Sequence, residues 1–335
     1  MKRIAYLDVA KGFTILTVIL GHTLPAGTLK TLLYSFHMPL FFFLSGYFFK
    51  PLRFPSLIRK KARQLLLPYA FTSLLLVLFS SLFLFLKGRL EEIPGNTTKL
   101  FFASLYGSGL DVHTPFFIPQ IGAIWFLLAL FWGFLLLNTL LLLPRPLPLL
   151  ILLFVLGLCT SPFFWLPFSF QPAMTATLYL FKGYQTRQRK LLEALRKHRT
   201  LPLLLLILWF FPALLGGEII LAGNVFPHII LNLLSSTSGI FPFLLLSFFL
   251  YRRTRLLSGY LQWMGSETLL ILCAHLLELR LFPWYLVHAF LTDTLCFTGW
   301  RIPAAIALCK TAIATAAVYV KHRWNSHPPR TYFIF

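Results

Sequence analysis

The sequence predicts an all-α, polytopic membrane protein with about ten transmembrane helices and both termini in the cytoplasm. Hydrophobic residues make up 58% of the 335 residues, and charged residues only 12%. Soluble domains carry roughly 25% charged residues, so this chain has too few charges to cover a surface exposed to water. Its 37 phenylalanines and 8 tryptophans also exclude a disordered chain, because such a composition collapses in water.

The prediction of transmembrane helices rests on ten apolar runs in the sequence. A helix that crosses ~30 Å of hydrocarbon needs ~20 mostly apolar residues. Runs of about this length lie near residues 5–24, 30–49, 65–86, 122–143, 147–165, 168–185, 201–222, 232–251, 259–280 and 301–320. The long segment 87–121, between the third and fourth runs, is interrupted by Gly and Pro and is expected to be partly re-entrant or interfacial.

The distribution of basic residues predicts the orientation. With the N-terminus inside, 22 of the 30 Lys and Arg residues fall in cytoplasmic loops and tails and 6 fall outside, as the positive-inside rule requires. Short basic clusters between apolar runs do not form a nucleic-acid-binding face, so no nucleic-acid partner is expected in spite of the net charge of +21. We expect a single membrane domain with its core at 5–320 and a short basic cytoplasmic tail at 321–335.

The first predicted helix carries three ionisable residues. Lys11 and His22 are eleven positions apart, which is close to a whole number of helical turns and a rise of ~16 Å. The two side chains therefore share a face at different depths, and Asp8 can pair with Lys11 from three residues away. The alternative is an interfacial anchoring pair and a histidine bonded to a neighbouring helix.

Two further histidines fall at the same predicted depth as His22. His37 lies early in the second predicted helix and His275 late in the ninth, so all three belong to the outer half of the membrane. Together they predict a polar cavity in which a neutral imidazole can accept a proton near pH 7. Charges inside a membrane need partners, so we also expect Glu267 in the ninth helix to pair with Lys310 in the tenth.

A basic cluster precedes the third predicted helix on the cytoplasmic side. Arg59, Lys60 and Arg63 lie within five residues, and Lys60 and Arg63 share a helix face. One interpretation of these basic residues is that they contact the phosphates of membrane lipids. The functional interpretation is a phosphate clamp for a nucleotide-bearing donor, since the Arg fork binds phosphate oxygens in pairs. The four cysteines lack paired spacing and predict neither a metal site nor a disulfide framework.

Several ordered blocks of this sequence resemble the acyltransferase-3 family of integral-membrane O-acyltransferases. Lys11 with His22 resembles the family's basic-residue–x10–His motif in the first helix, and Lys in place of the usual Arg is similar to the fucose 4-O-acetylase-like branch. The other resembling blocks are residues 36–47, the basic entry to the third helix at 59–69, the Trp-Phe-Leu block at 124–127, and the segment 265–275 with Thr268 where Ser is usual.

The resemblance implies an enzyme, an acyltransferase of groups other than aminoacyl groups, that moves acetyl from acetyl-CoA to hydroxyls of envelope glycans. No permanently bound cofactor or metal is expected; acyl-CoA is a substrate, and the partners are a glycan or other hydroxyl acceptor and the bilayer of the inner, cytoplasmic membrane. The residues expected to take part are His22, Lys11 and His37 as catalytic residues, Lys60, Arg63 and Arg59 as donor contacts, and Asp8, Trp125, Glu267 and His275 as cavity-lining residues.

Two other functions share these features. A transporter or flippase for lipid-linked glycans or small anions would also have ten helices, buried charges and a basic cytoplasmic rim. A non-catalytic envelope scaffold is the second alternative, against which the intact Lys11–His22 spacing speaks.

Overall fold

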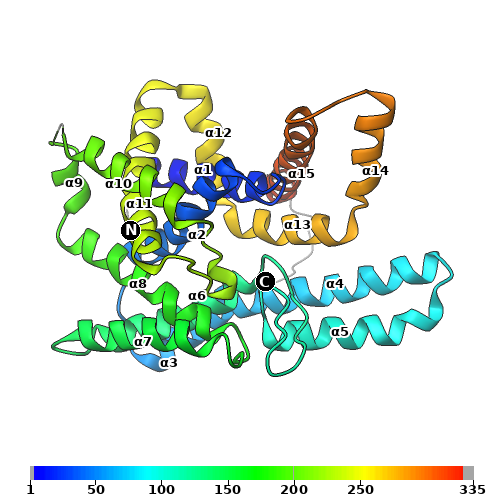
Figure 1. The fold of residues 1–335 in the computed structure, drawn as a ribbon, viewed down its shortest axis with the longest axis horizontal. Helices are drawn as coiled ribbons and strands as arrows, with labels where there is room; N and C mark the ends of the chain where they lie inside the picture. The colour runs from blue at the N-terminus through cyan, green and yellow to red at the C-terminus, as the bar shows by residue number, and fades with distance from the viewer. Residues whose placement is uncertain (1–3, 199, 327–335) are drawn as a thin grey trace.

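The structure, a computed structural model, describes residues 4–198 and 200–326, and within these ranges the regular structure is entirely helical (Figure 1). The helices in chain order are α1 Ala5–Gly21, α2 Thr28–Tyr47, α3 Phe54–Lys61, η1 Ala62–Leu66, α4 Leu67–Leu86, η2 Leu90–Glu92, α5 Ile93–Tyr106, α6 Trp125–Leu140, α7 Pro146–Thr160, α8 Phe170–Gln188, α9 Leu191–Leu195, α10 Leu201–Gly216, η3 Leu221–Gly223, α11 Ile229–Arg253, α12 Arg255–Ser266, α13 Thr268–Leu281, α14 Trp284–Ala289, η4 Phe290–Thr294 and α15 Arg301–Ser326.

The prediction of a helical membrane protein is confirmed. Among the described residues, three helical stretches are each long and apolar enough to cross a membrane, namely Phe54–Leu86, Ile229–Arg253 and Arg301–Trp324. A fourth candidate is the pair Thr268–Leu281 and Trp284–Thr294, which is bent by 75°. Each of the ten predicted runs contains helix, although several of these helices are shorter than a full span. The number ten and the cytoplasmic termini stay predictions.

The ninth predicted span is not one helix. It divides at Glu267, whose backbone (φ −120°, ψ 24°) leaves the helical region between α12 and α13. Gly265 and Ser266 precede this break, and both have lower helix propensity than the apolar residues around them. Glu267 therefore lies at a helix junction and not in the middle of a span.

The helices α1 and α2 lie at the centre of the bundle and are tightly packed through glycines. A Cβ added at Gly12 of α1 would meet the backbone of Leu261 in α12, and one added at Gly265 would meet the backbone of Asp8. In the same way, a Cβ added at Gly46 of α2 would meet the backbone of Leu180 in α8, and one added at Gly183 of α8 would meet the backbone of Phe43 in α2. Small residues allow this close backbone approach, which is the usual way membrane helices associate.

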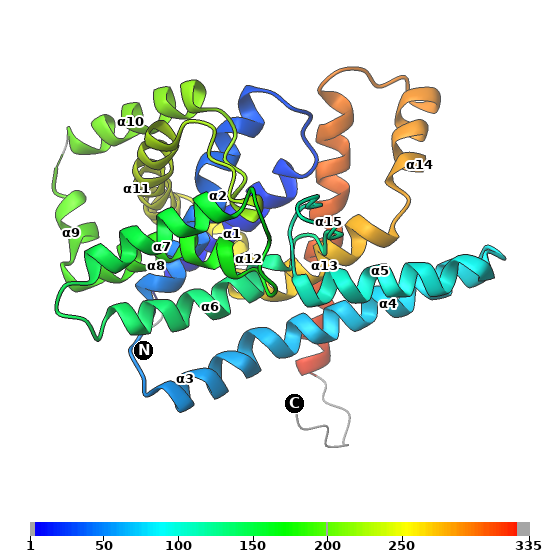
Figure 2. The ribbon, with the colours of Figure 1, turned by 60° about the horizontal axis from the view of Figure 1, so that its bottom comes forward.

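The segment after α2 forms a long arm at one side of the bundle. The helices α3, η1 and α4 run on continuously, and α5 returns along α4 as an antiparallel partner (Figure 2). In η1 the chain makes a π-helical turn at Ala62–Leu66, within the basic cluster singled out in the sequence; such turns are frequent at functional sites. The predicted interfacial segment 87–121 thus contains one full helix, α5.

The C-terminal helix α15 packs against α13 and continues past residue 320 to Ser326. Its Lys321 and His322 side chains reach Glu267, with 3.4 Å between His322 Nε2 and Glu267 Oε1. The predicted Glu267–Lys310 pair is therefore wrong, because the break after α12 places Glu267 beside the end of α15. Lys310 is buried, with its ammonium 4.8 Å from the centroid of the Trp284 ring. The rest of the predicted tail, 327–335, lies outside the described residues.

Candidate active site

Two cavities follow one another through the centre of the bundle. The first has a volume of about 580 Å³ and the second about 440 Å³. The same four helices, α1, α2, α6 and α13, contribute to both linings, and Met38 of α2 lines both cavities. The two cavities are therefore neighbours, and the Met38 side chain lies where their linings meet.

The helical periodicity of α1 explains how one helix lines both cavities. Lys11, Ile15 and Val18 face the first cavity, and His22, at the C-terminal end of the helix, faces the second. These positions recur every three or four residues and so form one face. The predicted common face of Lys11 and His22 is therefore present, with the two residues in different cavities.

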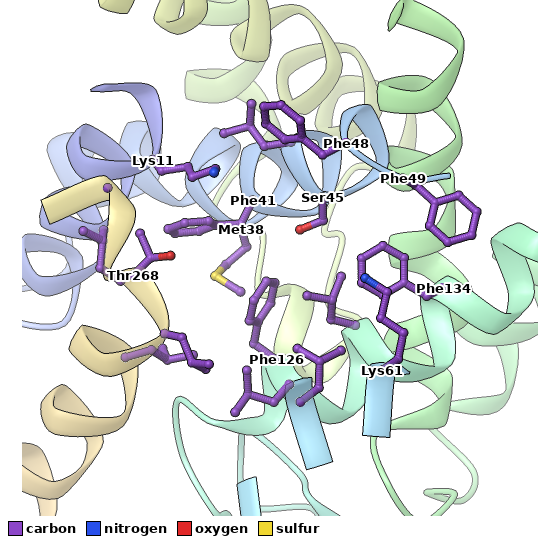
Figure 3. A pocket seen from close by; sticks show the side chains of 18 of the residues that line it. Lys11, Met38, Phe41, Ser45, Phe48, Phe49, Lys61, Phe126, Phe134 and Thr268 are labelled. Carbon is purple, nitrogen blue, oxygen red and sulfur yellow. The ribbon is translucent and has the colours of Figure 1, made fainter. Parts of the chain in front are cut away.

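The first cavity is rich in lysine (Figure 3). Lys11, Lys50, Lys60 and Lys61 all belong to its lining. Lys11 Nζ lies 3.0 Å from Asp8 Oδ1, as predicted, and Lys61 Nζ lies 3.6 Å from the centroid of the Phe134 ring. Because one of these four cations has a carboxylate neighbour in its own helix, the cavity keeps a net positive charge.

Hydroxyls and apolar side chains complete the first cavity. Figure 3 shows the hydroxyls of Ser45 and Thr268 directed into the cavity, with the Met38 side chain beside Phe126. Such a lining suits an elongated molecule that has polar amide groups along an otherwise apolar chain.

The predicted donor contacts gather at the mouth of the first cavity. Arg59, Lys60 and Arg63 line a shallow surface pocket of about 500 Å³ together with Ser56 and Gln64. Lys60 also lines the first cavity, so the surface pocket and the cavity are neighbours. The three cations are exposed, which leaves their nitrogens available to an anion.

The second cavity holds two of the three predicted histidines. His22 is exposed to this cavity, whereas His37 is buried at its wall and is held by a 2.6 Å hydrogen bond from Nδ1–H to the Leu33 carbonyl. A carbonyl only accepts, so this bond leaves the lone pair of His37 on Nε2. The Tyr34 ring lies between the two imidazoles, with its centroid 6.5 Å from His22 and 4.8 Å from His37.

The remaining lining of the second cavity combines aliphatic residues, such as Leu110, Ile219 and Leu276, with several polar ones. Trp125 belongs to it, as predicted, together with Gln120 and Arg280. Lys30 and Glu218 also line it, with 3.8 Å between Lys30 Nζ and Glu218 Oε1. These side chains offer hydrogen-bond donors and acceptors to a molecule in the cavity.

His275 lies directly behind His22. The two ring centroids are 5.4 Å apart, and His275 is buried rather than part of either cavity lining. Its Nδ1 lies 2.6 Å from Oε1 of Glu278, one turn later in α13. The prediction that the three histidines line one cavity holds for His22 and His37 and is wrong for His275, which is buried behind His22.

Two other predicted site residues, Asp8 and Glu267, lie next to the cavity linings and are not part of them. Asp8 is buried against Lys11, and Glu267 lies between the lining residues Ser266 and Thr268 without being one itself. Sequence reasoning missed Tyr34, which helical spacing from His37 could have indicated. It also missed Lys61 as a cavity residue, since of the basic cluster only Arg59, Lys60 and Arg63 were expected to contact the donor.

The fold and the site together define the class of protein. It is a helical membrane protein in which an internal cationic cavity lies next to a cavity lined by imidazoles. The acyltransferase-3 family, described as an acyltransferase domain, matches residues 4–322. The chain therefore belongs to this family and is a membrane enzyme that transfers acyl groups. Comparison with curated proteins gives no match, and comparison with solved structures gives none. The resemblance to the fucose 4-O-acetylase-like branch stays a prediction.

Proposed function

We propose that the protein is a membrane O-acetyltransferase that takes acetyl from cytoplasmic acetyl-CoA and transfers it to a hydroxyl of an envelope glycan on the other side of the membrane. The observation that carries this proposal is the pair of cavities that meet at Met38. One offers cations suited to a nucleotide donor, and the other offers imidazoles suited to a hydroxyl acceptor. Helix α1 connects them from Lys11 to His22.

The donor side is supported by the position of the cations. Coenzyme A is an anion at its nucleotide end and uncharged along its pantetheine arm. Arg59, Lys60 and Arg63 would hold the phosphates at the mouth, where the arginine forks can bind their oxygens in pairs. The arm would then extend past Lys11 and Ser45 to Met38, so that the thioester meets the second cavity. Coenzyme A is a substrate in this proposal and leaves after each turnover.

The chemistry is assigned to His22, which is exposed and lines the second cavity. As a general base it would take the proton of the acceptor hydroxyl while the hydroxyl oxygen attacks the thioester carbon. The C–S bond then breaks, and the sulfur takes the proton as the free thiol. As a nucleophile, His22 would instead carry the acetyl group before the hydroxyl receives it. His37, with its Nε2 lone pair, stands beside the same acceptor.

The orientation follows from the charge distribution. The cationic cavity lies at the end of the bundle that carries the basic loops, which the positive-inside rule assigns to the cytoplasm. The second cavity then opens outward, towards envelope glycans, and the protein is a multi-pass protein of the inner, cytoplasmic membrane.

The experiment that tests the function is transfer of a labelled acetyl group. Protein purified in nanodiscs would be incubated with [¹⁴C]acetyl-CoA and a total extract of membrane glycolipids and polysaccharide. Alkali-labile label in the glycan fraction, dependent on the protein, is the expected result. A transporter or flippase would leave the glycan unlabelled, and that result would overturn the proposal. Label on amino groups, which resists mild alkali, would contradict O-acetylation.

A further inference from the structure

Three segments that are far apart in the sequence meet at the C-terminal end of α11. The Tyr6 ring of α1 lies edge to face with the Phe248 ring of α11, with 5.4 Å between the centroids. Arg196, which follows α9, has its guanidinium carbon 4.7 Å from the centroid of Phe248 and 5.5 Å from that of Tyr6. The guanidinium carbon of Arg252 lies 5.8 Å from the same Phe248 centroid. One aromatic pair thus holds two guanidinium groups close together.

A pocket of about 400 Å³ lies beside this aromatic pair, lined by Phe248, Phe249, Arg252 and Arg253. The guanidinium carbon of Arg253 lies 5.9 Å from the centroid of the Phe249 ring, and both arginines are exposed. Within residues 4–198 and 200–326, neither arginine forms a salt bridge. Neighbouring cations repel each other, so an anion in this pocket would relieve the repulsion.

Positive charge at the end of α11 also has an ordinary explanation. Arginines near a helix C-terminus interact favourably with the helix dipole, and basic residues anchor the cytoplasmic ends of membrane helices. This explanation covers Arg252 and Arg253, but it does not explain why Arg196 reaches the same ring from another segment. Glu193 lies three residues before Arg196 and, like it, interacts electrostatically with Tyr6. It offsets one of the three charges, so the cluster keeps a net positive charge.

The apolar surface next to the pocket indicates that the anion belongs to a lipid. Helix α11 is one of the stretches long and apolar enough to cross a membrane, and it ends at Arg253. Leu246, Phe249 and Arg253 recur at helical spacing and therefore lie on one face, where Leu246 is 39% and Phe249 54% exposed. An exposed apolar strip that ends in an arginine matches a phospholipid, in which acyl chains end in a phosphate. A soluble anion would gain nothing from the strip.

We propose that this pocket binds the phosphate of an anionic phospholipid whose acyl chains lie along Leu246 and Phe249. The guanidinium groups of Arg252 and Arg253 suit this ligand, because a guanidinium binds phosphate oxygens in pairs and stacks on aromatic rings. Anionic lipids of the cytoplasmic leaflet are attracted to basic clusters at this level of a membrane protein. The pocket shares no lining residue with the two central cavities, so lipid binding does not depend on the proposed acyl transfer.

Native mass spectrometry of the full-length protein in detergent, titrated with single phospholipids, tests the site. The wild-type protein should bind one phosphatidylglycerol about tenfold more tightly than phosphatidylcholine, whose choline cancels the phosphate charge. Arg252→Gln/Arg253→Gln should abolish this preference. Lys197→Gln/Arg255→Gln, the matched control, removes two exposed charges outside the pocket and should bind as wild type does. Equal weakening in both double variants, or no preference in the wild type, would overturn the proposal in favour of diffuse attraction.

A second comparison distinguishes a lipid from a soluble anion. Glycerol 3-phosphate and inorganic phosphate carry the anion without acyl chains, so neither should displace phosphatidylglycerol at equal concentration. Phe249→Gln keeps both arginines and should weaken phosphatidylglycerol binding several-fold, because it removes apolar surface from the strip. Phe290→Gln changes a phenylalanine of similar exposure, 53%, on another segment and should bind as wild type does. Displacement by either soluble phosphate, or wild-type affinity in Phe249→Gln, would overturn the lipid and assign the pocket to a soluble anion.

Discussion

The Lys11 ammonium and the His22 imidazole lie on one face of α1, about three turns apart, and they face different cavities. A single helix thus contributes one group to the cationic cavity and one to the imidazole cavity. Its close packing on α12 through Gly12 and Gly265 fixes that face relative to α13, which also lines both cavities. The distance between the lysine of the first cavity and the imidazole of the second is therefore set by helix geometry.

His22→Ala should abolish acetyl transfer without preventing membrane insertion, since α1 stays long and apolar. Loss of a general base typically lowers the rate ~10²–10⁴-fold, and loss of a nucleophile can lower it further. His22→Gln keeps hydrogen bonding but accepts no proton, so it should be nearly as inactive. Labelled-acetyl transfer at matched protein levels measures this, with His113→Ala as the control. Transfer by His22→Gln near the wild-type rate would move the catalytic function to His37 or His275.

Arg63→Ala and Lys60→Ala should raise the apparent KM for acetyl-CoA while kcat changes less. Both side chains are exposed at the mouth of the first cavity, so they contribute to donor binding rather than to packing. Initial rates over a range of acetyl-CoA concentrations provide the measurement. Arg145→Ala, an exposed arginine outside these pockets, should behave as wild type. Equal KM values in all three variants would place the coenzyme elsewhere.

Met38→Trp should lower kcat strongly and leave the KM for acetyl-CoA nearly unchanged, because the larger ring closes the junction between the cavities after the nucleotide has bound. Met38→Leu preserves volume and should transfer acetyl at close to the wild-type rate. Met38→Ala should improve the use of propionyl-CoA and butyryl-CoA relative to acetyl-CoA. Identical donor preferences in these variants would show that the acyl group does not pass Met38.

Gly265→Ala should destabilise the protein by about 1–3 kcal/mol, the usual cost of overpacking, because its Cβ would meet the backbone of Asp8. Gly259 is the matched control in the same helix, since a Cβ there meets no atom within 4 Å. Gly259→Ala should therefore be neutral or slightly stabilising, as alanine favours a helix by ~0.5–1 kcal/mol over glycine. Thermal unfolding in one detergent compares the two. Equal unfolding temperatures would contradict the tight contact between α1 and α12.

The sequence predicted the features that depend on local periodicity. The face shared by Lys11 and His22, the Asp8–Lys11 pair and the helices at the ten apolar runs all follow from residue spacing and composition within one segment. The spacing rules apply inside a lipid-facing helix as they do in water, so these predictions needed no knowledge of the other helices.

Features that depend on two segments could not be predicted in the same way. The break at Glu267 is coupled to the reach of Lys321 and His322 from the far end of α15, and no spacing within the ninth run reveals that neighbour. The pair of His275 and Glu278 has an ordinary three-residue spacing, yet its position behind His22 depends on how α13 crosses α1. The hydropathy of an apolar helix does not indicate which other helices it packs against, because all of its faces are similarly apolar.

The shared wall at Met38 also determines where the membrane voltage falls. If water filled both cavities, most of the potential would drop across the layer around this thioether rather than across ~30 Å of hydrocarbon. Moving an elementary charge through that layer changes the free energy by about 2.3 kcal/mol for every 100 mV. In the proposed reaction, the uncharged pantetheine arm and the acetyl group would cross it without this cost, and the phosphates, bound at Arg59 and Arg63, would not enter it. Acetyl transfer by this protein should therefore be insensitive to the membrane potential.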